Sequence, residues 1–536
     1  MNAHRQVWCG LIRRFMVALI LACVAVSGLV ASATPSMSLV VTTKKGPVTG
    51  FETSTVRKFL GIPYAAAPVG DLRWNKPKPH ASWKKIGPRD ATSFGNHCPQ
   101  PASAFGTPSD TEDCLYLNVF APIDDSLHPV MVWIHGGSLW LGESDDYDPT
   151  RLVEQGVVVV TINYRLGELG FLSHRALGKP NGNYGLMDQQ LALKWVKQNI
   201  AHFGGDKKNV TLFGESAGAL SVHAQLASPT AKKQKLFHKA IVESGAYSLT
   251  QVSLSSAEAD GDAWVAAKIP TCSGLATAKQ TAACLRALSV TDVLTAQGLL
   301  VDPVLPIVDG KVLKQSIGDA FSSGEFNQVP VIEGSNHDEW RLFVELFNPT
   351  LTAGQYQSAI WNTLKLQLKP QPQAKLQQVL DHYPLSSYLS AKIALGAVGT
   401  DAIFACNART AAQLLSQYVT TYAYEFNDTN APMIFLAPDP PFPYGAYHAA
   451  EIPYIFDVPA APYPPTLDAD QQELSDTMVG YWTQFARTSD PNSSPPSAPL
   501  WPQYHADTDR QSLVPPTPEV ESGFAVDHQC AFWDSF

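Results

Sequence analysis

Apolar residues along the chain form short runs that alternate with stretches of helical character. The runs are rich in valine, isoleucine or aromatic residues and predict strands buried on both faces; they lie at residues 129–134, 156–162, 210–213, 329–332 and 421–426. Residues 191–200 have helical periodicity, and residues 250–300 and 350–415 are mainly helical in composition. The pattern predicts an α/β fold: a large, mostly parallel central sheet flanked by helices, with helical insertions over one end.

One of these runs leads directly into a serine between two glycines. Residues 210–213 are followed by Gly214-Glu215-Ser216-Ala217-Gly218 and then by a stretch rich in alanine and leucine. A strand, a sharp turn and a helix in this order are typical of a nucleophile elbow, where small neighbours leave room for an exposed serine hydroxyl. The five-residue pattern alone arises by chance in roughly one such chain in five. With its strand and helix, it predicts Ser216 as the nucleophile of a hydrolase.

The first 33 residues have the features of a signal peptide. Three arginines precede an apolar stretch at residues 15–30, and Ala31-Ser32-Ala33 forms a typical cleavage site. The apolar stretch is shorter than the ~20 residues of a spanning helix, and no later stretch reaches that length. A lipid-attachment site at Cys23 is a weaker alternative. We therefore expect residues 34–536 to form a single exported domain, periplasmic or secreted, without stable membrane insertion.

The charge of the chain is negative. Removal of the signal peptide would take away three arginines and no acid, which changes the formal charge from −10 to −13. An acidic chain with scattered lysine and arginine argues against nucleic acid or anionic membranes as partners. We expect the charge to serve solubility.

Six of the eight cysteines lie beyond the signal peptide. An even number in an exported chain predicts three disulfides, for which sequence alone allows fifteen connectivities. The pairs that are close in sequence, Cys98–Cys114 and Cys272–Cys284, are the natural choices and leave Cys406–Cys530. Because no pair has C-x-x-C spacing, we expect no metal site.

A nucleophilic serine needs a histidine base and an acid that orients it. The acid should follow a later strand, and Asp338 and Glu339 both do so, after residues 329–332. The residues alone do not choose between them. The base should come later still, where the candidates are His382, His448, His505 and His528; position in the chain favours His448 without settling the choice.

The oxyanion of an acyl-transfer reaction needs backbone N–H donors. In a nucleophile elbow, one donor is the residue after the serine, here Ala217. Further donors should come from a glycine-rich turn after an early strand, and Gly136-Gly137 follows the apolar run at 129–134. This turn is the candidate for the rest of the oxyanion hole.

Several blocks in order give the chain a resemblance to the type-B carboxylesterases, the carboxylesterase and cholinesterase family of α/β-hydrolases. The blocks are residues 59–65 with 68–73, residues 112–122, residues 203–206 leading to the elbow, residues 335–339, and residues 445–448 with Glu451. The resemblance covers nearly all of residues 39–536. It implies the α/β-hydrolase fold, a carboxylic ester as small-molecule substrate and no cofactor; it leaves the oligomeric state open.

The resemblance also implies roles for individual residues. It selects Glu339 as the acid and His448 as the base, and it places the oxyanion donors at Gly137, Ser138 and Ala217. It supports the disulfide pairing given above. It therefore implies that His448 takes the proton from Ser216 and that an acyl-enzyme forms and is hydrolysed.

Two positions depart from the family pattern. Ser138 stands where the family usually has a third glycine, so it is strained if its φ is positive. Trp340 follows the acid where the family usually has glycine, and its size could reshape the pocket wall. Neither change removes a member of the catalytic triad.

Two other functions are weighed against an esterase of uncharged substrates. A cholinesterase needs an aromatic face for the quaternary ammonium, and in cholinesterases a tryptophan in the first disulfide loop serves this purpose. Here that loop contains only Phe105 as an aromatic residue. Family members that act as adhesion proteins lack the nucleophile, whereas Ser216 is present.

Overall fold

A large mixed sheet organises the chain in the computed structural model, which describes residues 38–298, 304–365, 367–369, 371–437, 441–492 and 498–536. The residues from Leu39 onward form one compact unit. The strands of the sheet are β1 (Ser38–Thr42), β2 (Pro47–Glu52), β3 (Val56–Pro63), β4 (Arg89–Asp90), β5 (Tyr116–Pro122), β6 (His128–Ile134), β7 (Val158–Ile162), β8 (Gly205–Glu215), β9 (Lys239–Glu243), β10 (Val331–Asn336), β11 (Thr421–Phe426), β12 (Arg510–Leu513) and β13 (Glu519–Glu521).

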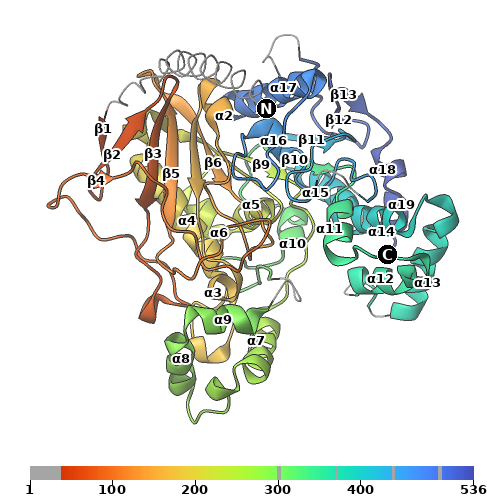
Figure 1. Cartoon of the computed structure of the whole chain (residues 1–536), viewed down its shortest axis with the longest axis horizontal. Helices are drawn as coiled ribbons and strands as arrows, with labels where there is room; N and C mark the ends of the chain where they lie inside the picture. The colour runs from red at the N-terminus through yellow and green to blue at the C-terminus, as the bar shows by residue number, and fades with distance from the viewer. Residues whose placement is uncertain (1–37, 299–303, 366, 370, 438–440, 493–497) are drawn as a thin grey trace, which may run out of the picture. The chain divides into compact units, whose positions relative to one another are not determined.

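The strand order is β1-β2-β3-β5-β7-β6-β8-β9-β10-β11-β12-β13, with β4 paired to β2. From β7 to β12 all neighbours are parallel. Antiparallel pairs occur toward the two edges, at β2–β3, β3–β5, β5–β7 and β12–β13. Figure 1 shows this order from β1–β4 on the left to β12 and β13 on the right. The predicted parallel sheet is thus the central part of a mixed sheet.

Helices cover both faces of the sheet, so β7, β10 and β11 are buried throughout, and β6 is buried after its first residue. The helices are α2 (Thr150–Glu154), α3 (Gly167–Phe171), α4 (Tyr184–Asn199), α5 (Ala217–Ala227), α6 (Pro229–Gln234), α7 (Leu254–Lys268), α8 (Ala278–Ala287), α9 (Val290–Gln297), α10 (Ile317–Ser322), α11 (Trp340–Phe347), α12 (Tyr356–Leu364), α13 (Pro372–His382), α14 (Ala391–Gly399), α15 (Cys406–Ser416), α16 (Ile452–Ile455), α17 (Ala469–Thr488), α18 (Phe524–Asp527) and α19 (Cys530–Trp533).

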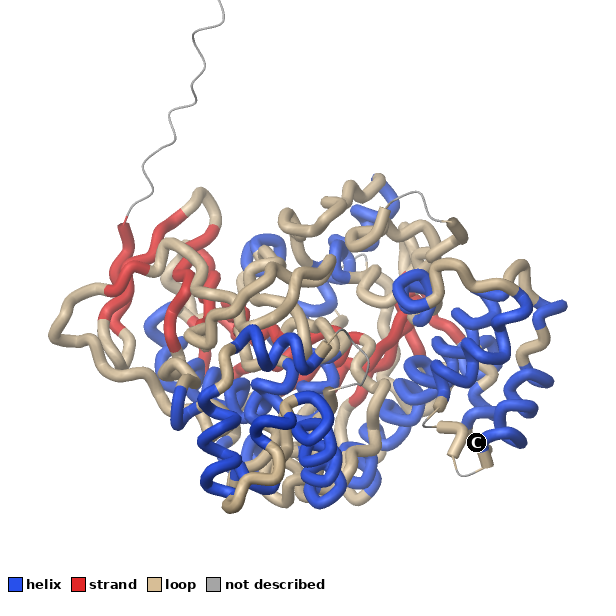
Figure 2. Tube along the Cα trace, turned by 60° about the horizontal axis from the view of Figure 1, so that its bottom comes forward, coloured by secondary structure: helices blue, strands red, loops and turns tan. Residues whose placement is uncertain are grey.

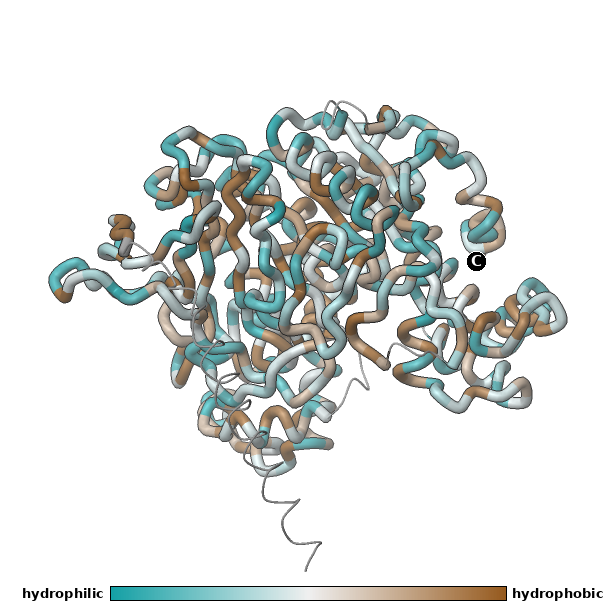
Figure 3. The backbone as a smooth tube through the Cα atoms, turned by 45° about the horizontal axis from the view of Figure 1, so that its top comes forward, coloured by the Kyte–Doolittle hydropathy of each residue, from teal (hydrophilic) through white to brown (hydrophobic). Residues whose placement is uncertain are grey.

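Two hydrophobic cores lie on opposite sides of the sheet. One is built from the strands with α4, α5 and α10, and the other from the strands with α2, α16, α17 and the helices α11–α14. Figure 2 shows the strands crossing between the helices, and Figure 3 shows hydrophobic residues concentrated along the central strands. A sheet packed on both sides is the arrangement expected of continuous apolar strands.

The elements predicted from the sequence correspond closely to those observed. The five apolar runs fall on β6, β7, β8, β10 and β11, although β8 begins five residues earlier than predicted and β7 and β10 each begin two residues later. Residues 250–298 contain α7–α9, and residues 350–415 contain α12–α15 apart from their undescribed positions. Figure 1 shows α7–α9 as one group and α12–α14 as another. The expected signal peptide lies outside the described residues, and within the described part of the chain no helix has the length and apolarity to cross a membrane.

Three disulfides join the cysteines in the expected pairs. Cys98–Cys114 and Cys272–Cys284 close short loops, and Cys406–Cys530 joins the start of α15 to α19 over 124 positions. In the chain-entropy model, cross-links of these spans stabilise the fold by about 3–5 kcal/mol each. Disulfides are typical of proteins in oxidising compartments, with which export is consistent.

Candidate active site

Ser216 stands at the turn between β8 and α5. Its φ of 54° and ψ of −121° are unusual for a residue with a side chain, and its N–H donates to the Glu243 carbonyl at 2.8 Å. The flanking residues must be glycine because a side chain would not fit at either position. A Cβ on Gly218 would lie 1.9 Å from the Ile134 carbonyl oxygen, and one on Gly214 would lie 2.6 Å from the same atom. The strand, turn and helix predicted around Ser216 are therefore present, with β6 pressed against the turn.

His448 lies opposite Ser216 on the loop that leads into α16. Its Nε2 is 2.7 Å from the Ser216 Oγ, and its Nδ1 is 2.5 Å from Glu339 Oε2. The rings of Phe343 and Phe404 lie 5.0 and 4.9 Å from the imidazole ring, centre to centre. Ser216, His448 and Glu339, which the sequence predicted, thus form a continuous series of contacts, although they come from three distant parts of the chain.

Glu339 and Asp338, which the residues alone could not tell apart, point in different directions. Glu339 is fully buried, and its second oxygen accepts from the N–H of Asn336 at 2.8 Å. Asp338 instead pairs with Arg341 at 2.8 Å and accepts from the Ala446 N–H at 3.1 Å. Burial raises the pKa of Asp338, but the hydrogen bond and charge of His337 and the charge of Arg341 outweigh it, so the net shift is downward. Of the two acids, only Glu339 contacts His448.

The glycine-rich turn after β6 lies against the serine. A Cβ on Gly136 would be 3.2 Å from the Ser216 Cβ, so this turn and the start of α5 border the same space. Gly137 has a φ of 95°, and Ser138 has a φ of 59°. Ser138 therefore has the positive φ that its place in a glycine-rich turn suggested, a conformation that costs a non-glycine residue roughly 1–2 kcal/mol. Gly137, Ser138 and Ala217 remain the candidate oxyanion donors.

Sequence reasoning assigned no role to Glu215, which neighbours the serine in the elbow motif. Its Oε1 lies 3.2 Å from His448 Nε2, and the side chain is buried. Burial raises the pKa of Glu215 to about 8, against the opposing charge of His448. For His448, burial lowers the pKa, but the negative charges of Glu215 and Glu339 outweigh burial and raise it to about 9. Its position next to Ser216 in the elbow motif is the signal in the sequence that could have found Glu215.

A cavity of about 340 Å³ opens onto Ser216 and His448. Its walls are mostly apolar and come from the first disulfide loop, α11 and the loops before and after α16. Phe105 and Phe435 pack together on one side with their ring centres 4.7 Å apart. The acids that line it include Asp146, whose pKa is raised to about 8 by burial and by the charges of Glu143 and Asp145.

Trp340 does not line this cavity. It begins α11, and its ring packs 4.7 Å from Phe343 and 6.2 Å from Phe404. Both phenylalanines contact His448. Trp340 is therefore not itself part of the pocket wall; it packs against Phe343, which is, and it supports the residues behind the histidine.

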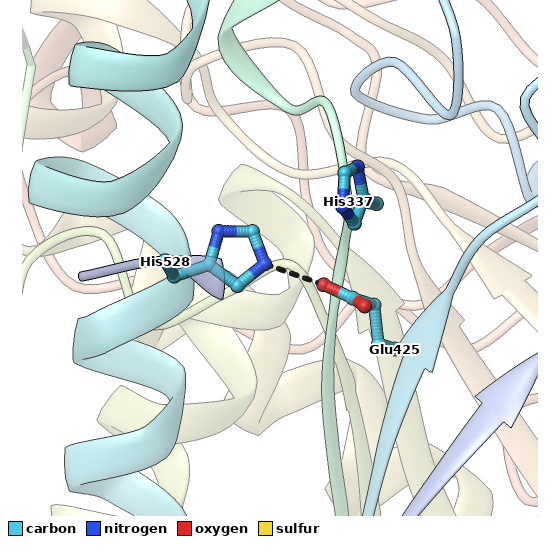
Figure 4. A group of neighbouring side chains, drawn as sticks. All are labelled: His337, Glu425 and His528. Carbon is cyan, nitrogen blue, oxygen red and sulfur yellow. Dashed lines mark hydrogen bonds and ion pairs between the residues drawn. The ribbon is translucent and has the colours of Figure 1, made fainter. Parts of the chain in front are cut away.

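A second buried histidine lies near the acid loop. His528 Nδ1 is 2.7 Å from Asp401, and its Nε2 is 2.6 Å from Glu425, with His337 beside them (Figure 4). The potential ligand atoms of His337, Glu425 and His528 lie within 4.8 Å of one another, close enough to hold a metal ion. However, carboxylates occupy both nitrogens of His528. Burial lowers the pKa of His528, but Glu425 and Asp401 raise it well above its usual value. We interpret the group as a buried ion-pair network.

The fold has a counterpart among solved structures. A structure titled PNB esterase matches with a TM-score of 0.77 and 33% identity, covering 92% of this chain and all of the other. Fold and site together define an α/β-hydrolase with a serine, histidine and glutamate at the end of its parallel strands.

The family follows from comparisons of sequence. The carboxylesterase family model matches residues 37–533. The para-nitrobenzyl esterase of Bacillus subtilis is 36% identical over 492 residues, which is 89% of this chain and 94% of that protein. A pyrethroid hydrolase of Rattus norvegicus is 34% identical over 483 residues, 86% and 82% of the two chains. The chain belongs to the carboxylesterase family, and it is a carboxylic ester hydrolase.

Proposed function

We propose that the protein cleaves carboxylic esters through a Ser216–His448–Glu339 triad and an acyl-enzyme intermediate. The main support is the position of His448, 2.7 Å from the serine hydroxyl and 2.5 Å from a fully buried carboxylate. A base between a nucleophile and an orienting acid is the arrangement that acyl transfer by serine requires.

The reaction proceeds in two halves. His448 Nε2 takes the hydroxyl proton as Ser216 Oγ bonds to the ester carbonyl carbon, and the oxyanion accepts from the N–H groups of Gly137, Ser138 and Ala217. The carbon–oxygen bond to the alcohol then breaks, and the alcohol leaves with the proton from His448. Water, deprotonated by His448, attacks the acyl-enzyme and releases the acid and the free serine. Glu339 stabilises the imidazolium in both halves.

The pocket suggests the class of substrate. Aromatic and aliphatic side chains form most of the wall, including Phe105, Phe343, Phe347 and Phe435. No lysine or arginine is among the described residues that line the cavity, so the wall offers no fixed positive charge to a substrate that carries its own carboxylate. We therefore propose uncharged esters with a small aromatic or apolar group as substrates.

Labelling and substitution of the serine test this proposal. Turnover of p-nitrophenyl esters should fall by about 10⁴-fold or more in Ser216→Ala, and a serine-directed phosphonate should attach to the peptide that contains Ser216. Ser221→Ala, a buried serine in α5 that donates to the Ala217 carbonyl, is the matched control and should keep its activity. Surviving activity in Ser216→Ala would remove the proposal.

We also propose that the protein is exported after removal of residues 1–33. The support is the sequence of that segment and the three disulfides. Mass spectrometry of the protein made in a secreting bacterial host should find Thr34 at the amino terminus of the mature chain. A chain that keeps residues 1–33 would contradict the assignment.

A further inference from the structure

Exposed lysines are concentrated in one stretch of this acidic chain. Residues 194–239 contain eight lysines and two acids, of which one is the buried Glu215, whereas the whole chain has ten more acids than lysines and arginines. Seven of the eight lysines are exposed, and they come from α4, the start of β8 and α6 with the residue after it: Lys194, Lys197, Lys207, Lys208, Lys232, Lys233 and Lys235. The expectation that lysine and arginine are scattered through the chain is therefore corrected for this stretch, where positive charge is concentrated.

Four of the chain's lysines line a single open hollow of about 600 Å³. They are Lys44, Lys194, Lys197 and Lys207, together with Gln198, His202, Gln234 and Leu236. Hydrogen bonds hold the segments together: the Lys44 N–H donates to Asn199 Oδ1 at 2.8 Å, and Lys197 Nζ donates to the Gln234 carbonyl. The hollow is thus a defined feature of the folded chain.

The charges around the hollow are not neutralised within the chain. In the described residues, the lysines that form ion pairs with carboxylates are Lys58 and Lys392, and neither belongs to this surface. The pKa of the nearby His238 reflects this charge: burial lowers it, and the charges of Lys239, Lys197 and Lys235 lower it further against the opposing charge of Asp206. Such a surface attracts closely spaced anions.

The hollow and the candidate active site lie at opposite ends of the parallel strands. Lys207 and Lys208 are near the amino end of β8, and Ser216 follows its carboxyl end. Nine residues of extended chain lead from Lys207 to Ser216, which at about 3.3 Å per residue separates the two by roughly 30 Å. A large partner bound at the lysines therefore leaves the mouth of the substrate cavity open.

We propose that this lysine surface, defined by Lys44, Lys194, Lys197 and Lys207 around the hollow, binds the phosphate groups of an anionic lipid bilayer. Lysines spread over several segments suit an array of phosphates better than one small anion. No phenylalanine, tyrosine or tryptophan lines the hollow, so it offers no stacking surface for single-stranded nucleic acid. The contact is electrostatic and peripheral, which is compatible with a chain that does not insert. The choice of a lipid bilayer as the source of these phosphate groups rests on the proposed export of the protein.

Vesicle binding by the purified mature protein, residues 34–536, tests this. The protein should sediment with vesicles of phosphatidylglycerol and phosphatidylcholine at low salt, should not sediment with phosphatidylcholine alone, and should be released by salt. The triple variant Lys44→Gln, Lys194→Gln, Lys207→Gln should bind about a hundred-fold more weakly, since each lysine near such a surface contributes about five-fold. The matched control is Lys268→Gln, Lys279→Gln, Lys314→Gln, three exposed lysines elsewhere with the same change in charge; it should bind like the unmodified protein. Both variants should keep their activity on a soluble ester.

Three outcomes would overturn the proposal: no binding to anionic vesicles, equal loss in the two triple variants, or tighter binding of pyrophosphate or a short DNA duplex than of the vesicles. Ser216→Ala should bind vesicles normally. Failure of the catalytic assignment and failure of the lysine surface are therefore seen in separate measurements.

Discussion

His448 and His528 are both buried imidazoles held by carboxylates at the carboxyl end of the sheet, but they are placed for different purposes. His448 contacts Glu339 through Nδ1, and its Nε2 lies 2.7 Å from a serine hydroxyl at the base of a cavity, with Glu215 further away at 3.2 Å. His528 lies between two carboxylates, Asp401 and Glu425, and has no free nitrogen. A buried histidine can act as a base only if one nitrogen stays available to accept a proton.

The comparison separates catalysis from stability. The His448 arrangement directs one acceptor toward a reacting group, whereas the His528 arrangement satisfies both donors of an imidazolium within the protein. His528 also lies two residues before Cys530, whose disulfide joins the C-terminal segment to α15. We therefore expect substitution of the first histidine to lower activity and substitution of the second to lower stability.

The largest expected effect is on turnover. His448→Gln should lower kcat/KM for a p-nitrophenyl ester by about 10⁴-fold or more, because the serine loses its base. His528→Gln should retain most of the activity when assayed well below its unfolding temperature. Comparable losses in the two variants would show that the distinction between the histidines is wrong.

Next is the choice between adjacent acids. Glu339→Gln should lower kcat by about 10³–10⁴-fold, since the amide cannot stabilise the imidazolium of His448. Asp338→Asn keeps the shape of the side chain and weakens its contacts with Arg341 and His337, so activity should fall by less than about ten-fold. Steady-state kinetics on both variants distinguish the two acids. A larger loss of activity in Asp338→Asn than in Glu339→Gln would show that Asp338 is the acid of the triad.

The effect of His528→Gln on stability, expressed as a free energy, is expected to be smaller than the effect of His448→Gln on turnover. Removal of one partner from a buried ion pair costs about 3–5 kcal/mol, so denaturant unfolding of His528→Gln should show a loss in that range. Because the folded-state pKa of His528 is raised, its contribution is fully present below about pH 6.5 and is lost as pH rises through the raised value. The two proteins should therefore differ less in alkaline solution; a constant difference would contradict the charged state.

The smallest effect concerns pH dependence. Loss of the negative charge in Glu215→Gln should lower the pKa of His448 from about 9, so the acidic limb of kcat/KM should move down by about one to three pH units. The control is Asp146→Asn, another acid on the cavity wall that does not contact His448. An unmoved limb in Glu215→Gln would show that Glu215 does not act on the base.

The sequence predicts the elements better than the contacts between them. The apolar runs located the strands because burial on both faces leaves a strong local pattern. The elbow predicted Ser216 as the nucleophile for the same local reason, but the choice of Glu339 and His448 needed the family resemblance. The cluster of Asp401, Glu425 and His528 has no signal in spacing, since its residues are brought together only by folding. The lysine surface was missed because an average charge hides where the charges lie.

Trp340 has a consequence for how this chain can change. A Cβ on Gly399 would lie 2.0 Å from the Trp340 ring, so the tryptophan is tolerated only while residue 399 remains glycine. Residues 340 and 399 therefore constrain each other where α11 meets α14. Alanine can replace Gly399 only if a smaller residue has first replaced Trp340. Libraries that vary the surroundings of the histidine one position at a time would discard such pairs, and the order in which the substitutions are made would decide which variants fold.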